Sequence, residues 1–213
     1  MTTLNQIVTI LAERVGRQYD LVFKRQLKTM VGMWRETILR QALKDNPKDQ
    51  SYFQSSWTMP IVEDYEVKCP FNYGCVMKTK DPLPSTLRID QIPFTFIGSP
   101  DLKTSYTFVY PNQLEFANTS RNRKKDAVYY TLLDGYGYFY NLQKKVKYIG
   151  VQAIPTDLYA VGKFKKCNST EACYSDDLPY PLTGDLVQRL IQAILGTELK
   201  TMIQTNNPEE VKV

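Results

Sequence analysis

The spacing of apolar residues changes twice along this chain, and this change constrains the fold more than any other feature. Apolar side chains recur every three to four positions near both ends, which is typical of amphipathic helices. Between about 52 and 165 the period is two, with breaks at proline, glycine and asparagine, which predicts strands. We therefore expect an α+β fold with an N-terminal helical pair, a central antiparallel β domain (sandwich or barrel-like), and a C-terminal amphipathic helix that packs on the helical layer.

The N-terminal helices carry their own boundary signals. Thr3 and Gln6 have the spacing of a capping box, and Asp20 can cap a second helix that Asn46 and Pro47 end. At 1.5 Å per residue this second helix would be about 36 Å long, which exceeds the reach of one small domain. Its apolar stripe is expected to contain Phe23, Leu27, Met30, Trp34 and Ile38.

The C-terminal helix has the widest apolar face. Asp185 can cap its first turn, and Gly196 is expected to mark a kink or a close backbone approach. Two adjacent apolar rows cover nearly half of the circumference, so this face must be buried within the subunit or against a neighbour. The residues expected to make this subunit packing are Leu186, Leu190, Ile191, Ile194 and Leu195.

These patterns divide the chain into four segments. We expect a helical arm over 1–48, a β domain over 49–182, a C-terminal helix of the helical layer over 183–203, and a flexible tail over 204–213. Within the β domain, Asp134-Gly135 lies between two aromatic-rich runs and predicts a hairpin with a type I′ turn.

Positive charge gathers at the N-terminus. The chain has 27 Lys and Arg against 22 Asp and Glu, and the whole excess lies in residues 1–44. Lys24, Lys28 and Arg35 fall within about 40° of one another on a helical wheel, beside the apolar stripe. We expect these three cations to bind acidic side chains of a protein partner. Contact with DNA and a simple solvated face are the alternatives.

Catalytic chemistry finds little support in the residues. The chain has no histidine, which excludes Ser–His and Cys–His nucleophile activation and histidine metal ligation. We expect no enzyme activity, no cofactor and no essential metal. One alternative is a metal-dependent nuclease built on Asp64, Glu66 and Lys68, whose carboxylates would hold Mg²⁺ while the lysine lies near the attacking water.

The four cysteines form two pairs with equal spacing, Cys69 with Cys75 and Cys167 with Cys173. Five intervening residues fit a structural zinc loop poorly. Thiols, disulfides and metal ligands all remain open for these pairs. The sequence shows neither a membrane-spanning run nor a secretory signal, so we expect synthesis in a cytosol, where thiols stay reduced.

Both ends of the chain resemble one family of proteins. The segments "ILAERVGRQYDLVFKRQL" (10–27) and "LPYPLTGDLVQRLIQAILGTELK" (178–200) are similar to head-to-tail connector and tail adaptor ring proteins of short-tailed bacteriophages, particularly crAss-like phages. The resemblance implies a structural virion protein without catalysis, assembled in the host cytoplasm and located at the head–tail junction.

The same resemblance implies the partners. They are further copies of the chain in a ring, with twelve copies as the number inherited from a portal, the portal itself, and other connector or tail proteins. Double-stranded DNA would pass through the lumen without sequence-specific binding. A second function is a nucleic-acid-binding protein that uses the basic N-terminal helices. The resemblance assigns no role to any individual residue.

Overall fold

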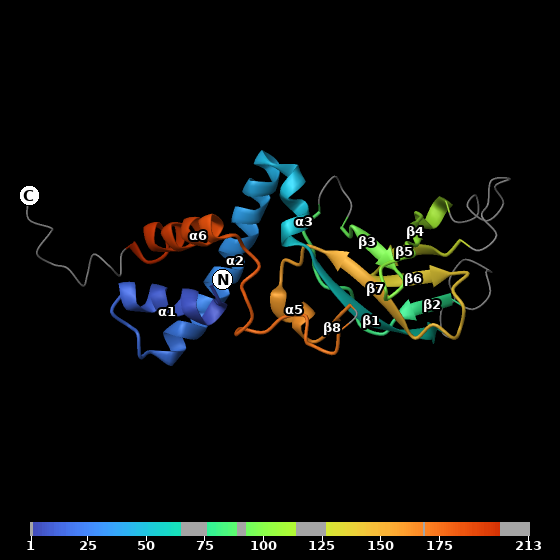
Figure 1. The fold of residues 1–213 in the computed structure, drawn as a ribbon, viewed down its shortest axis with the longest axis horizontal. Helices are drawn as coiled ribbons and strands as arrows, with labels where there is room; N and C mark the ends of the chain where they lie inside the picture. The colour runs from blue at the N-terminus through green and yellow to red at the C-terminus, as the bar shows by residue number, and fades with distance from the viewer. Residues whose placement is uncertain (1, 65–75, 89–92, 114–126, 168, 201–213) are drawn as a thin grey trace, which may run out of the picture. The chain divides into compact units, whose positions relative to one another are not determined.

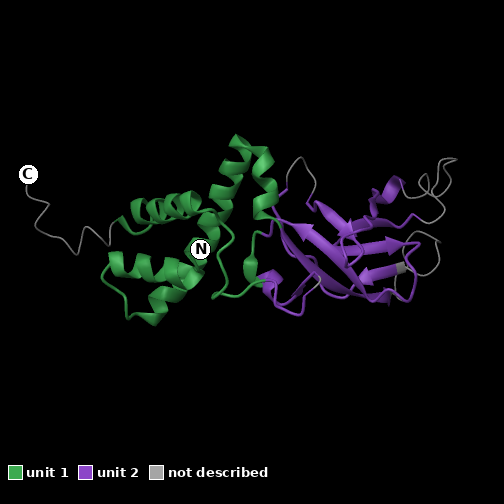
Figure 2. Ribbon diagram, viewed as in Figure 1, with its two compact units in different colours: residues 1–54, 156–159, 174–213 green, residues 55–155, 160–173 purple. Residues whose placement is uncertain are grey.

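A computed structural model of the protein describes residues 2–64, 76–88, 93–113, 127–167 and 169–200 (Figure 1). The chain forms two compact units (Figure 2). Unit 1 contains residues 1–54, 156–159 and 174–213, and unit 2 contains residues 55–155 and 160–173. Unit 1 holds the long helices and unit 2 holds the sheet, which confirms the predicted α+β class.

Unit 1 is built from helices of both chain ends. Thr3 caps the first helix: its Oγ1 accepts a hydrogen bond from Gln6 N at 3.2 Å, while its own N–H donates to Gln6 Oε1 at 3.0 Å. Asp20 caps the second helix through Phe23 N at 2.9 Å. Both caps were predicted from the sequence. The helices are α1 (Leu4–Arg14), α2 (Leu21–Asp45), η1 (Pro47–Asp49), α3 (Gln50–Phe53) and α6 (Gly184–Gly196).

The core of unit 1 lies where α2 packs against α1 and α6. The fully buried row of α2 runs through Leu27, Val31, Arg35 and Leu39, whereas Met30 and Trp34 are only half-buried. The predicted stripe is therefore wrong at those two positions. The buried face is rotated toward Val31 and Leu39 because α1 and α6 cover that side, and this rotation takes Arg35 into the core.

The N-cap of helix α6 lies two positions before the expected one. Thr183 is the N-cap residue and Asp185 lies within the first turn. The Thr183 hydroxyl bonds to the Asp185 carboxylate and lowers the pKa of that group. Gly196 is the last helical residue, and apart from its chain neighbours and its own helical turn, no atom of the described residues lies within 4 Å of the position where a Cβ would stand. The predicted close backbone approach at Gly196 is therefore wrong; the glycine ends the helix instead.

Unit 2 is one curled sheet. Its strand order is β3-β7-β1-β2-β6-β5-β4, with β8 paired to β1 beside β2. All pairs are antiparallel except β4 with β5. The strands are β1 (Ser55–Asp64), β2 (Val76–Thr79), β3 (Phe96–Gly98), β4 (Thr107–Phe108), β5 (Tyr129–Leu133), β6 (Tyr136–Tyr140), β7 (Tyr148–Ala153) and β8 (Lys165–Lys166). The short helix η2 (Pro111–Gln113) also belongs to unit 2, whereas α5 (Leu158–Gly162) begins in unit 1 and ends in unit 2.

The alternation of apolar and polar residues along the central strand β1 determines which of its side chains lie in the core of unit 2. Trp57, Met59 and Ile61 of β1 point inward, and Trp57 and Met59 pair with Val151 and Ile149 of β7. The predicted hairpin is present: Leu133 pairs with Tyr136 across a turn in which Asp134 and Gly135 have φ of 49° and 80°. Both values fit a type I′ turn, and glycine or a short polar residue tolerates them best.

One glycine pair allows the chain to approach this sheet closely. Gly98 of β3 pairs with Gly150 of β7. A Cβ on Gly150 would stand 2.6 Å from Ser99 O, and one on Gly98 would stand 2.1 Å from Thr104 O. Only glycine lets the chain after β3 fold back so closely over the strands.

Among the helices that the structure describes, none is both long and apolar enough to span a membrane.

Candidate assembly site

The three cations predicted to bind a partner lie at different depths of unit 1. Lys24 is half-buried on α2. Lys28 is half-buried too, and its Nζ lies 2.5 Å from Asp176 Oδ2 of the same chain. Arg35 has no exposed surface. Helical-wheel proximity therefore does not make one cationic surface here, because the packing face of α2 passes through Arg35.

Arg35 stands beside a cavity of about 40 Å³ that is enclosed by α2 and by the segments around 156–159 and 174–180. Burial lowers the pKa of Arg35, and the nearby Tyr180, Tyr174 and Glu36 oppose that shift. Burial also raises the pKa of Tyr174 and of Tyr180, so both hydroxyls stay neutral at physiological pH. The guanidinium thus lies between α2 and two other segments of unit 1. No partner can reach it while this packing holds.

Four of the five packing residues predicted on α6 lie in the core of unit 1. Leu190 and Ile194 have no exposed surface, and Leu186 and Ile191 are also buried. Leu195 is half-buried. Together with Ile10 of α1 it lines a groove of about 600 Å³ between α1 and α6. The apolar face of α6 is therefore used mainly within the subunit, and its last turn opens onto a surface groove.

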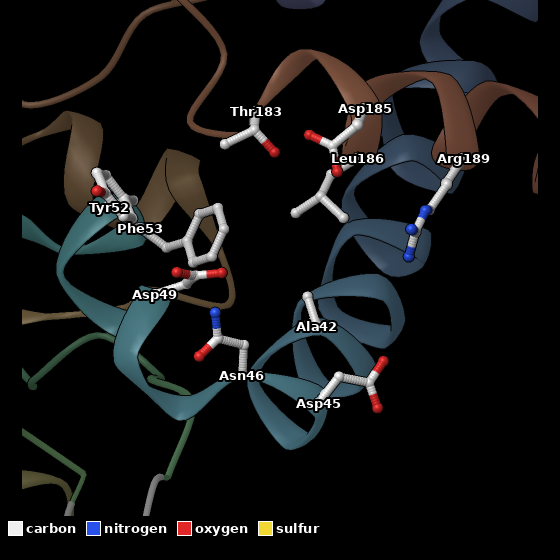
Figure 3. Close-up of a pocket in the computed structure, with 10 residues that line it drawn as sticks. All are labelled: Ala42, Asp45, Asn46, Asp49, Tyr52, Phe53, Thr183, Asp185, Leu186 and Arg189. Carbon is white, nitrogen blue, oxygen red and sulfur yellow. The ribbon is translucent and has the colours of Figure 1, made fainter.

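A second depression lies where α2, α3 and the start of α6 meet (Figure 3). Its volume is about 350 Å³, and the carboxylates of Asp45, Asp49 and Asp185 stand around it with Arg189. Figure 3 shows these side chains spread around the rim rather than converging on one point. Within the described part of the chain, no group of three or more Asp, Glu and Cys side chains has the arrangement of a metal site.

Unit 2 contains a lysine-rich segment that the division of charges at residue 44 concealed, although Lys144 pairs with Glu63 at 2.6 Å and Lys166 with Glu171 at 3.4 Å. Residues 144–166 contain six lysines and one acid, Asp157. Because β7 and β8 both pair with β1, the ends of this segment meet: Tyr148 lies opposite Pro60, and Lys165 lies opposite Thr58. A groove of about 650 Å³ forms there. A sliding count of charge along the sequence, rather than one division at residue 44, would have found this segment.

The comparison with protein families identifies the chain. Residues 5–212 match the model of the family described as phage tail ring protein 2 (CrAss_Ring_2). The chain belongs to this family. The resemblance expected from both ends of the sequence is thereby confirmed, and the match runs through the β unit as well. No curated protein matches the chain.

Membership in a family of tail ring proteins gives the chain a structural role in the virion of a bacteriophage. The nuclease alternative falls largely outside the described residues, which include neither Glu66 nor Lys68, nor the side chain of Asp64. The same holds for Cys69 and Cys75.

The second cysteine pair can be placed in unit 2. Cys167 and Cys173 are free, half-buried thiols. Burial raises the pKa of Cys173 to about 11, although Lys166 nearby lowers it, and burial raises the pKa of Cys167 as well. Thiols with a raised pKa are poor nucleophiles and poor metal ligands at neutral pH. This chemistry favours a packing role for the pair.

Proposed function

We propose that the chain forms a closed ring at the head–tail junction, where it links the portal to the tail and surrounds the path of the DNA. The observation that carries this proposal is the match to a tail ring family over residues 5–212, which includes both units. A ring subunit needs no catalytic group. It needs a stable core and surfaces for copies of itself and for the rings above and below.

We assign the contact with the portal to the flank of α2 that carries the half-buried Lys24. Lys28 contributes less than the sequence suggests, because Asp176 already neutralises it at 2.5 Å. Arg35 acts from inside, by holding α2 to its neighbouring segments. An ion pair at the rim of an interface contributes only about 0.2–1 kcal/mol, but repetition around a ring multiplies it and speeds docking.

The basic groove of unit 2 supports a second part of the proposal, that the ring faces DNA without reading its sequence. Lys163 and Lys165 line this groove together with one acid, Asp81, and the half-exposed ring of Tyr148. Lysine side chains attract phosphates as point charges, and nothing in such a contact depends on the base sequence. If the chain binds nucleic acid, this surface is favoured over Lys28 and Arg35, because those two are neutralised or buried.

Assembly of variant subunits tests the portal contact. Lys24→Glu should prevent joining to portal-bearing heads while the melting temperature stays unchanged. Lys44→Glu makes the same change of charge at an exposed position of the same helix and should assemble normally. Joining would be scored by electron microscopy of heads and by the presence of the subunit in purified particles. Normal joining of Lys24→Glu would reduce Lys24 to a solvated residue.

A further inference from the structure

Three large apolar side chains stand in solvent at the turn between α1 and α2. Tyr19 is 87% exposed, Leu21 is 73% exposed and Val22 is 67% exposed. Single apolar residues on a surface are ordinary, but three within four positions form a patch of the kind that marks a contact surface. We call Tyr19, Leu21 and Val22 the turn patch.

The turn that carries this patch is fixed by short-range contacts. Gly16 has φ of 71°, which lets the chain leave α1 sharply. Asp20 caps α2, and its other carboxylate oxygen lies 3.8 Å from Arg17 Nε. The Arg17 guanidinium lies over the ring of Phe23, 5.1 Å from its centre, and Phe23 is buried in the core. A patch presented by an ordered turn loses little conformational entropy when it docks.

The same unit carries a groove that suits such a patch. The α1–α6 groove has an apolar floor of Ile10, Ile191 and Leu195 and a volume of about 600 Å³. That volume is in the range of roughly 300–1,000 Å³ found for clefts that enclose a small ligand. An apolar centre within a polar rim is the usual anatomy of a protein interface. The rim consists of Glu13, Arg14, Gln188 and Gln192.

The patch and the groove are made by different residues of unit 1. In Figure 1 the α1–α2 turn and α6 lie on opposite sides of α1. Two different, complementary surfaces on one subunit make a head-to-tail contact, and such contacts produce closed rings when the rotation between copies closes. A self-complementary surface would instead give only a two-fold dimer.

We propose that the subunits of the ring join head to tail through unit 1, with the turn patch of one copy seated in the α1–α6 groove of the next. This inference rests on the proposed ring function and names the surface that builds it. Leu21 and Val22 contact the apolar floor, and Tyr19 covers its edge. Arg25, which is exposed one helical turn after Leu21, lies at the rim, where Glu13 of the neighbouring copy offers a carboxylate.

Disulfide trapping between two single variants of the full chain tests this contact. One chain carries Leu21→Cys and the other carries Ile10→Cys, and wild-type protein sets the background from the native thiols. Mild oxidation of the equal mixture should give a covalent dimer on a non-reducing gel, well above the wild-type background. The double variant should give a ladder of higher species, because each copy then carries both halves of the contact.

Each other outcome contradicts a definite part of the proposal. A dimer from Leu21→Cys alone, formed as fast as in the mixture, would mean a contact between two turn patches. The mixture would be tested at protein concentrations up to that at which the wild type forms rings or precipitates. If the mixed dimer is absent throughout this range, the docking is overturned. A yield that rises severalfold in chains ending at Lys200 would make residues 201–213 of the same chain the native occupant of the groove, which also overturns it.

A charge placed in the patch gives an independent measurement. Leu21→Asp should raise the protein concentration at which oligomers form by at least about tenfold, the change that a lost contact of 1.4 kcal/mol produces. Gln41→Asp, at an exposed position near the other end of the same helix, should leave that concentration unchanged. If the protein forms rings but the mixed disulfide does not form, this contact is overturned and the proposed function still stands. Absence of the chain from virions would overturn the function alone.

Discussion

Leu190 provides a quantitative test of how α6 is used. Its side chain has no exposed surface, and it lies in the α6 face that packs on α1 and α2. Replacing a fully buried leucine with alanine removes apolar contact and leaves a cavity, which costs about 2–5 kcal/mol. For a chain of this size each kcal/mol lowers the melting temperature by about 2–4 °C. Leu190→Ala should therefore lower it by about 4–20 °C.

Two positions on the same helix serve as matched controls. Gln188 is exposed, so Gln188→Ala should change the free energy of unfolding by no more than about 0.5 kcal/mol. Leu195 is half-buried in the α1–α6 groove, so Leu195→Ala should cost only about 1 kcal/mol, roughly half of full burial. The main effect of Leu195→Ala should be on the association of subunits rather than on the stability of one subunit.

The assay is thermal and urea denaturation followed by far-ultraviolet circular dichroism, which reports chiefly on the helices of unit 1. All three variants would be measured at the same dilute concentration, so that association does not add to stability. A loss below about 1 kcal/mol for Leu190→Ala would refute the packing of α6 within the subunit. It would move the whole apolar face of this helix to an interface between copies.

Three further predictions follow from single contacts. Lys28→Glu places a carboxylate against Asp176 and should lower stability by roughly 1 kcal/mol, whereas Lys24→Glu should not; equal melting temperatures would contradict the ion pair. Asp20→Ala should cost about 0.5–2 kcal/mol and Asp20→Ser much less, and an equal loss would remove the cap as the reason. Burial raises the pKa of Cys173 from 9.0 to about 11, so alkylation at pH 8, followed by peptide mass spectrometry, should be about 100-fold slower in the folded chain than in urea; equal rates would contradict the burial.

Local signals in the sequence predicted local structure well. The caps at Thr3 and Asp20 and the turn at Asp134-Gly135 depend on residues within four positions of one another, and all three are present as predicted. The same holds for the change of period that separates helices from strands. Such features depend on backbone chemistry that acts over a few residues, so they are the same whichever distant segments pack against them.

Features that depend on distant segments were missed. Arg35 was placed on a surface because a charged side chain usually lies there, yet the loops at 156–159 and 174–180 fold over it. The basic groove of unit 2 exists only because β7 and β8 both pair with β1. The α1–α6 groove likewise joins residues separated by nearly the whole chain. Periodicity in one segment carries no information about which other segment will cover it.

The most direct measurement of the central claim is negative-stain electron microscopy of the purified full chain and of disrupted virions, with the chain located by a specific antibody. The account predicts closed rings of identical subunits, with the antibody bound where the head joins the tail. Particles that lack the chain, or that carry it only at a site away from any ring, would contradict the account.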